Sequence, residues 1–195
     1  MAQVILTSKL DKIPFLTIGL ITLSAIYFVT VNKPPSNRLL EWIINPIIHA
    51  DSWHLIGNVI TLGIAGSLVE LWVCADSKKE RFKSFLIVYG INQAITIRRW
   101  VAQGEPSIGL SLFIYAFMGM AVYNYSNSQF SNGLRKWEKL APIAIGFLLA
   151  IAFIDFLTNS VQLGLISAIF ADWQHLLAFG FGVVAFHFQK IQNRA

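Results

Sequence analysis

Uncharged apolar segments recur along this 195-residue chain and restrict its fold more than any other feature. Residues 13–31 and 107–125 contain no Asp, Glu, Lys or Arg at all. A helix needs about 20 mainly apolar residues to cross roughly 30 Å of hydrocarbon. Only 13% of the residues are charged, about half the ~25% of soluble domains. The sequence therefore predicts a polytopic membrane protein and excludes a soluble enzyme, a nucleic-acid-binding domain and a disordered chain.

Six mainly apolar segments, of which three contain one charged residue each (Glu70, Lys83 or Asp155), predict an all-α membrane protein, a six-transmembrane-helix bundle that forms a single domain over residues 1–195. The third segment is the weakest, because Lys83 lies near one end and Asn92 and Gln93 lie inside it. The expected spans are residues 13–31, 54–73, 82–97, 107–125, 141–158 and 173–189.

The basic residues predict the orientation of this bundle. Six spans place eleven of the 15 Lys and Arg residues on one side, and only Lys33, Arg38, Arg98 and Arg99 on the other. Short cytoplasmic loops carry the excess of Lys and Arg, so both termini are expected in the cytoplasm. A multi-pass protein of the cell membrane is expected, because no transit peptide or retention signal is visible. The lipid bilayer is one expected partner, and nucleic acid is not, since the charges are divided among short loops.

Polar side chains from three expected spans fall at a similar depth near the extracytoplasmic face. His54 and Asn58 are four residues apart and share one helix face. Ser111 follows an expected N-cap, Ser107, and would lie ~6 Å below the start of that helix. His175 is expected near the start of the last span. Polar groups inside a membrane are costly, so their convergence predicts a functional site.

Small residues accompany Ser111 and His175 and would let the two helices approach closely. A direct hydrogen bond between serine and histidine needs such an approach. These residues are Gly109, Ala116, Gly119, Ala178 and Gly182.

Motifs around these residues follow one another in a definite order. Residues 49–58 read HADSWHLIGN, residues 66–70 read GSLVE, residues 109–119 read GLSLFIYAFMG, and residues 175–182 read HLLAFGFG. They resemble the rhomboid family of intramembrane serine proteases, whose patterns include H-x4-H-x3-N, G-x-S-G and H-x-x-G-x-x-x-G. The resemblance covers three of the six expected helices. It implies a rhomboid-like fold and a serine endopeptidase that cleaves transmembrane protein substrates near their extracytoplasmic end.

The resemblance also implies roles for individual residues. Ser111 and His175 would form a catalytic dyad that works through an acyl-enzyme, with no metal or other cofactor. His54 and Asn58, together with the backbone N–H of Ser111, would stabilise the oxyanion, at roughly 3 kcal/mol for each donor. Tyr115 would pack on the His175 ring. The supporting residues further include His49 and Gly109, and a polar cavity lined in part by His49 and Gln93 would admit water.

The sequence departs from the family patterns at two positions. Leu112 stands where G-x-S-G has its second glycine, and is expected to narrow the substrate cleft or shift the oxyanion site. Ala178 replaces a glycine and is expected to loosen the helix contact slightly. Asp172, three residues before His175, is expected to be the N-cap of the last helix.

Other functions stay open at this point. Leu112 supports a catalytically inactive rhomboid-like protein that binds transmembrane helices. His49, His54 and His175 could form an open zinc site with three protein ligands. A small transporter is disfavoured, because no inverted repeat of interrupted helices is visible.

Overall fold

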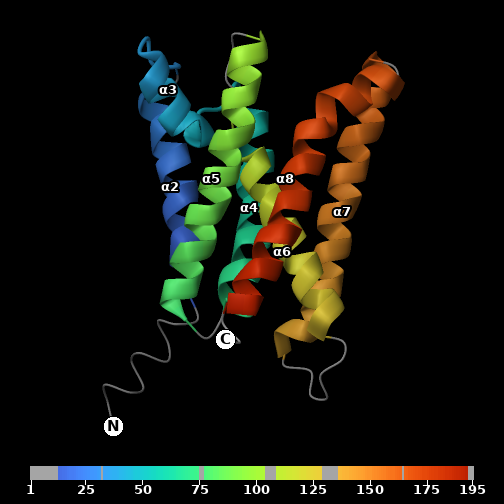
Figure 1. Ribbon diagram of the computed structural model, residues 1–195. Helices are drawn as coiled ribbons and strands as arrows, with labels where there is room; N and C mark the ends of the chain where they lie inside the picture. The colour runs from blue at the N-terminus through green and yellow to red at the C-terminus, as the bar shows by residue number, and fades with distance from the viewer. Residues whose placement is uncertain are drawn as a thin grey trace.

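The computed structural model describes residues 13–31, 33–74, 77–103, 109–128, 136–163 and 165–192. Within these residues every regular element is helical (Figure 1), which confirms the all-α prediction. The elements are α2 (Phe15–Thr30), α3 (Arg38–Ile44), the 3-10 turn η1 (Asn45–Ile47), α4 (Ser52–Leu68), the π-helical turn η2 (Val69–Val73), α5 (Lys78–Gln103), α6 (Ser111–Ser128), α7 (Lys136–Leu163) and α8 (Leu165–Gln192).

Three helices are longer than the predicted spans. Helices α5, α7 and α8 contain 26, 28 and 28 residues, and at 1.5 Å per residue they measure roughly 40 Å. Because α8 begins at Leu165, Asp172 lies inside the helix and is not its N-cap. The apolar stretch before Asp172 continues the helix toward its N-terminus.

Among the described residues, one helical segment is long and apolar enough to cross a membrane, Ser52–Val73. Phe15–Thr30 and Leu140–Ile154 are apolar but shorter. Helix length and composition therefore leave the count of six spans a prediction.

Helix α6 occupies the centre of the bundle and contacts α4, α5, α7 and α8, with α8 as its most extensive neighbour. It begins inside the bundle, below the upper ends of α5, α7 and α8 (Figure 1). The side chains of Phe113, Phe117 and Met120 on α6 belong to the main hydrophobic core. The start of α2 and the end of α8 lie at the same end of the bundle (Figure 1).

The contact between α6 and α8 is a contact between their backbones. A Cβ atom added at Gly119 would collide with the carbonyl oxygen of Phe179, and one added at Gly182 would collide with the carbonyl oxygen of Ala116. Any larger residue would push the helices apart. The small residues predicted to allow a close approach do so at Gly119 and Gly182.

A buried carboxylate fixes the lower end of α2. Glu70, on the π-helical turn η2, accepts hydrogen bonds from the backbone N–H of Leu16 at 3.2 Å and from the N–H and hydroxyl of Thr17 at 2.6 and 2.7 Å. Pro14, the N-cap residue, makes no side-chain cap bond, so Glu70 supplies the cap from a distant part of the chain. A negative charge at a helix N-terminus also interacts favourably with the helix dipole.

We predict that Gly182→Ala lowers Tm by several degrees, whereas Gly180→Ala on the same helix does not. The added methyl at position 182 meets the α6 backbone, and overpacking of this kind costs about 1–3 kcal/mol. Position 180 has no neighbouring heavy atom within 4 Å of an added Cβ, and alanine favours the helix over glycine. Thermal unfolding in detergent measures both variants, and an equal Tm for the two would contradict a backbone contact at Gly182.

Candidate active site

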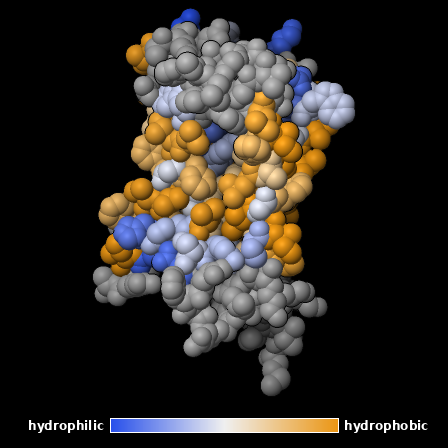
Figure 2. All heavy atoms as spheres, turned by 90° about the vertical axis from the view of Figure 1, so that its right-hand side faces the viewer, coloured by the Kyte–Doolittle hydropathy of each residue, from blue (hydrophilic) through white to orange (hydrophobic). Residues whose placement is uncertain are grey.

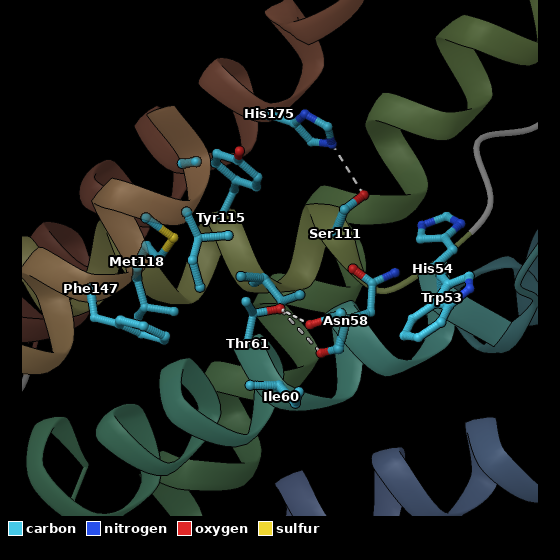
Figure 3. Close-up of a pocket in the computed structure, with 15 residues that line it drawn as sticks. Trp53, His54, Asn58, Ile60, Thr61, Ser111, Tyr115, Met118, Phe147 and His175 are labelled. Atoms are coloured by element: carbon cyan, nitrogen blue, oxygen red, sulfur yellow. Dashed lines mark hydrogen bonds between the residues drawn. The ribbon is translucent and has the colours of Figure 1, made fainter. Parts of the chain in front are cut away.

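A cavity of about 600 Å³ opens between α4, α6, α7 and α8. Five of the residues singled out from the sequence line it: His54, Asn58, Ser111, Tyr115 and His175. Their side chains gather at one end of the cavity, while Met118, Phe147 and Ile60 lie at the other (Figure 3). Most cavities that bind ligands share this composition, with a few polar groups set in an apolar lining.

Ser111 and His175 form a direct hydrogen bond in this cavity. Their Oγ and Nε2 atoms are 3.1 Å apart (Figure 3). Ser111 is the first residue of α6. The prediction that it lies one turn inside the helix is therefore wrong, and Ser107 lies outside the described residues. His175 lies in the middle of α8 rather than near its start.

The ring of Tyr115 stacks on the ring of His175, as predicted. The ring centroids are 4.5 Å apart and the planes differ by 12°. Tyr115 is four residues after Ser111, so both side chains project from the same face of α6. The stacking restricts rotation of the imidazole and keeps its Nε2 atom directed at the hydroxyl of Ser111.

The turn before α6 brings two polar side chains of α4 close to Ser111. Gly109 has a φ of +98°, a conformation that residues with a side chain rarely adopt. A Cβ atom at this position would lie 3.0 Å from His54 Nε2 and 3.1 Å from Asn58 Nδ2. The missing side chain of Gly109 thus leaves a small space beside His54 Nε2 and Asn58 Nδ2. Gly109 precedes Ser111 by two residues.

Asn58 carries a hydrogen-bond donor with nothing to bind in the described part of the chain. Its Nδ2 atom is buried and without a hydrogen-bond partner. Leaving a buried donor unpaired costs about 1–3 kcal/mol, and native proteins keep few such groups. A donor that faces a cavity in this state is suited to bind a ligand oxygen.

The local sequence explains why His54 is well placed. Asp51 is the N-cap of α4, and its side chain accepts a hydrogen bond from the backbone N–H of His54 at 2.8 Å. This cap fixes the first turn of α4. Sequence reasoning missed this role of Asp51, although an Asp three residues before a helical position is a typical N-cap signal.

His49 supports His54 instead of lining the cavity. It is 6% exposed, and its ring lies edge-on to the His54 ring at 5.3 Å between centroids. Its Nδ1 atom is 3.2 Å from the carbonyl oxygen of Ile47. Burial lowers the pKa of His49, which favours a neutral imidazole. The expectation that His49 and Gln93 line the cavity is wrong, because neither is among its lining residues. Gln93 instead donates to the carbonyl oxygen of Ile43 in α3.

The described residues contain no group of three or more His, Cys, Asp or Glu side chains arranged to hold a metal ion. His175 bonds to Ser111, while His49 and His54 contact each other. The three histidines of the zinc alternative therefore do not gather around one point.

Leu112 does not line the cavity, so the expectation that it narrows the substrate cleft is wrong. An effect of Leu112 on the oxyanion site stays a prediction. Its side chain is 2% exposed and packs against Ile95 of α5 and Ala178 of α8. It follows Ser111 by one residue, so it points about 100° away around α6. The two departures from the family patterns, Leu112 and Ala178, fill one small apolar cluster together.

We predict that Leu112→Ala lowers the stability by about 2–5 kcal/mol and does not raise the activity of the folded fraction. The substitution leaves a hole in a buried cluster and changes nothing that lines the cavity. Chemical denaturation and activity per folded molecule measure the two effects. Higher activity per molecule in this variant would mean that Leu112 does obstruct the site.

The cavity thus combines a serine–histidine pair, an aromatic ring stacked on the histidine and nearby amide and imidazole nitrogens inside a helical bundle. A family model for the Rhomboid domain matches residues 36–189. The chain belongs to the rhomboid family and is an integral membrane protein. Members of this family are generally intramembrane serine proteases that act on transmembrane substrates. No curated protein and no solved structure matches the chain.

Proposed function

We propose that this protein is an intramembrane serine endopeptidase that uses Ser111 as its nucleophile and His175 as its general base. The observation that carries the proposal is the 3.1 Å separation of Ser111 Oγ and His175 Nε2 at the edge of an open cavity. A nucleophile and a base within hydrogen-bond reach are the minimum that covalent catalysis of this kind requires.

The chemistry follows from the positions of these two groups. With a proton on Nδ1, His175 has a lone pair on Nε2 and accepts the hydroxyl proton as Ser111 attacks a peptide carbonyl. The tetrahedral intermediate collapses to an acyl-enzyme when His175 gives that proton to the leaving amine. Water then enters the cavity, loses a proton to His175 and attacks the acyl carbon. The ester bond to Ser111 breaks as His175 returns the proton to Ser111 Oγ, and the second product leaves as a carboxylic acid.

The oxyanion is stabilised by donors on two elements. Asn58 Nδ2 and His54 Nε2 both approach the open side of Gly109, and the backbone N–H of Ser111 lies at the N-terminus of α6. Developing negative charge at this position also faces the positive end of the α6 dipole. Among the described residues Asn58 Nδ2 has no hydrogen-bond partner, which supports this role, since the oxyanion would supply one.

The substrate is a transmembrane helix that unwinds near its extracytoplasmic end. A peptide carbonyl in an intact helix is hydrogen-bonded within the helix, so the bond to be cut must leave the helix before Ser111 can attack. The apolar end of the cavity, with Ile60, Met118 and Phe147, suits apolar side chains of such a segment.

The protein crosses the cell membrane six times, with both termini in the cytoplasm. The apolar outer surface of the bundle supports a position in lipid. Large apolar side chains are exposed on the face that carries α7 and α8 (Figure 2). Lipid, unlike water, solvates such a surface favourably. The residues include Ile143, Phe153, Ile154, Leu176 and Phe188. The distribution of Lys and Arg sets the orientation.

An inactive protein that binds transmembrane helices is the alternative. Its support came from Leu112 beside the nucleophile, and Leu112 lies outside the cavity lining. The same experiment tests both functions.

We expect Ser111→Ala and His175→Ala to abolish cleavage of a transmembrane substrate in detergent, and Ser111→Ala to abolish labelling by a fluorophosphonate. Ser126→Ala, an exposed serine on the same helix whose hydroxyl bonds the carbonyl oxygen of Tyr123, is the matched control and should keep both activities. Wild-type cleavage by Ser111→Ala would refute the protease, and a wild-type protein that neither cleaves nor labels would favour the helix-binding alternative.

We expect Asn58→Ala to lower kcat by about 10²–10³-fold, the usual cost of one oxyanion donor. KM should change little, because the donor acts in the transition state. The Tm should stay close to that of the wild type, because Nδ2 of Asn58 makes no hydrogen bond within the described chain. An unchanged kcat would remove Asn58 from the oxyanion site.

A further inference from the structure

A buried asparagine outside the cavity links α5 to the turn that carries the nucleophile. Asn45 begins η1 and is 1% exposed. Its Nδ2 atom donates to Thr96 Oγ1 at 2.9 Å, and its Oδ1 atom accepts from Asn92 Nδ2 at 3.0 Å. Both partners lie on α5 and are buried. The amide group is therefore held at its donor and at its acceptor, which leaves it one orientation.

The backbone carbonyl of Asn45 bonds to the turn before α6. Its carbonyl oxygen accepts a hydrogen bond from the backbone N–H of Gly109 at 3.0 Å. This bond fixes the residue with the positive φ, immediately beside His54 Nε2 and Asn58 Nδ2. The next residue, Leu110, accepts the first hydrogen bond of α6 from Ile114. The position of Gly109 thus sets where α6 begins and where its first N–H groups point.

We propose that Asn45 is a positioning residue: its side chain is anchored on Asn92 and Thr96, and its carbonyl holds Gly109 so that the backbone N–H of Ser111 and the α4 donors converge on one oxyanion. The inference rests on the proposed protease function and assigns a residue that touches neither substrate nor nucleophile. Sequence analysis did not identify Asn45, although the polar pair Asn92 and Gln93 inside an expected span was a visible signal.

The physical reason is the sensitivity of catalysis to small displacements. A shift of about 1 Å in a reacting group can cost 10²-fold in rate, and oxyanion donors act only at hydrogen-bond distance. The turn at Gly109 has no side chain of its own to pack. Its geometry depends on its neighbours, and Asn45 is the neighbour to which its N–H is bonded.

Thr96→Val is the sharpest test, because valine has the shape of threonine and removes only the hydroxyl that receives Asn45 Nδ2. Asn45→Ala is the second variant, which removes both side-chain bonds and keeps the backbone carbonyl. We expect kcat to fall by roughly 10–100-fold in both, with KM within about twofold of the wild type. Thr96→Ser restores the hydroxyl and should restore kcat.

A merely structural role predicts a different result. It lowers the Tm and the folded fraction but leaves the rate per functional site unchanged. Rates are therefore divided by the number of sites that react with a fluorophosphonate at completion, and the rate of that reaction is measured as well. Ser24→Ala is the control, because Ser24 is another fully buried hydroxyl, on α2, and it donates to the carbonyl oxygen of Leu20 in its own helix.

The proposal is supported if Thr96→Val and Asn45→Ala lower kcat per titrated site and Thr96→Ser and Ser24→Ala do not. It is overturned if either of the first two keeps the wild-type kcat per site, or if Thr96→Ser is as slow as Thr96→Val. A failure of the protease proposal is distinguishable, because then Ser111→Ala would cleave the substrate as the wild type does.

Discussion

The backbone contact between α6 and α8 is the constraint on which the rest of the site depends. Gly119 and Gly182 leave no room for a Cβ atom between the two helices, so the distance between the helix axes is fixed by main-chain atoms. Main-chain atoms have no rotamers and tolerate little displacement. Two short side chains, Ser111 and His175, can therefore meet at 3.1 Å without any movement of the helices. The stacking of Tyr115 on His175 then removes the remaining freedom of the imidazole.

Two buried polar side chains, Glu70 and Asn58, differ in their hydrogen bonding. Glu70 is satisfied, because it receives three hydrogen bonds at the start of α2. Near the cavity, Asn58 keeps a donor without a partner among the described residues. Burying an unpaired donor destabilises the fold, whereas the hydrogen bonds to Glu70 stabilise it. The unpaired donor of Asn58 therefore lowers the stability of the fold at the place where a ligand oxygen would bind.

The sequence predicted the helical class, the pairing of Ser111 with His175 and the stacking of Tyr115, because these follow from motif order and from helical spacing. It failed where the outcome depends on neighbours that are distant in sequence. The start of α6 is set by the positive φ of Gly109 and by its bond to Asn45, which no local pattern reveals. The sequence placed Leu112 at the substrate cleft, but its side chain packs against Ile95 and Ala178, because adjacent residues on a helix face different surroundings. Asn45 was missed because a buried asparagine in a loop looks like an ordinary turn residue until its partners on α5 are known.

The most direct test of the central claim is an experimental structure, in lipid, of the protein after reaction with a fluorophosphonate. The account predicts a covalent bond from phosphorus to Ser111 Oγ, with His175 Nε2 still within hydrogen-bond reach. It further predicts that the phosphonyl oxygen lies in the open space beside Gly109, bonded to Asn58 Nδ2 and His54 Nε2. An adduct on another residue, or a phosphonyl oxygen directed away from α4 with α6 and α8 separated, would contradict it.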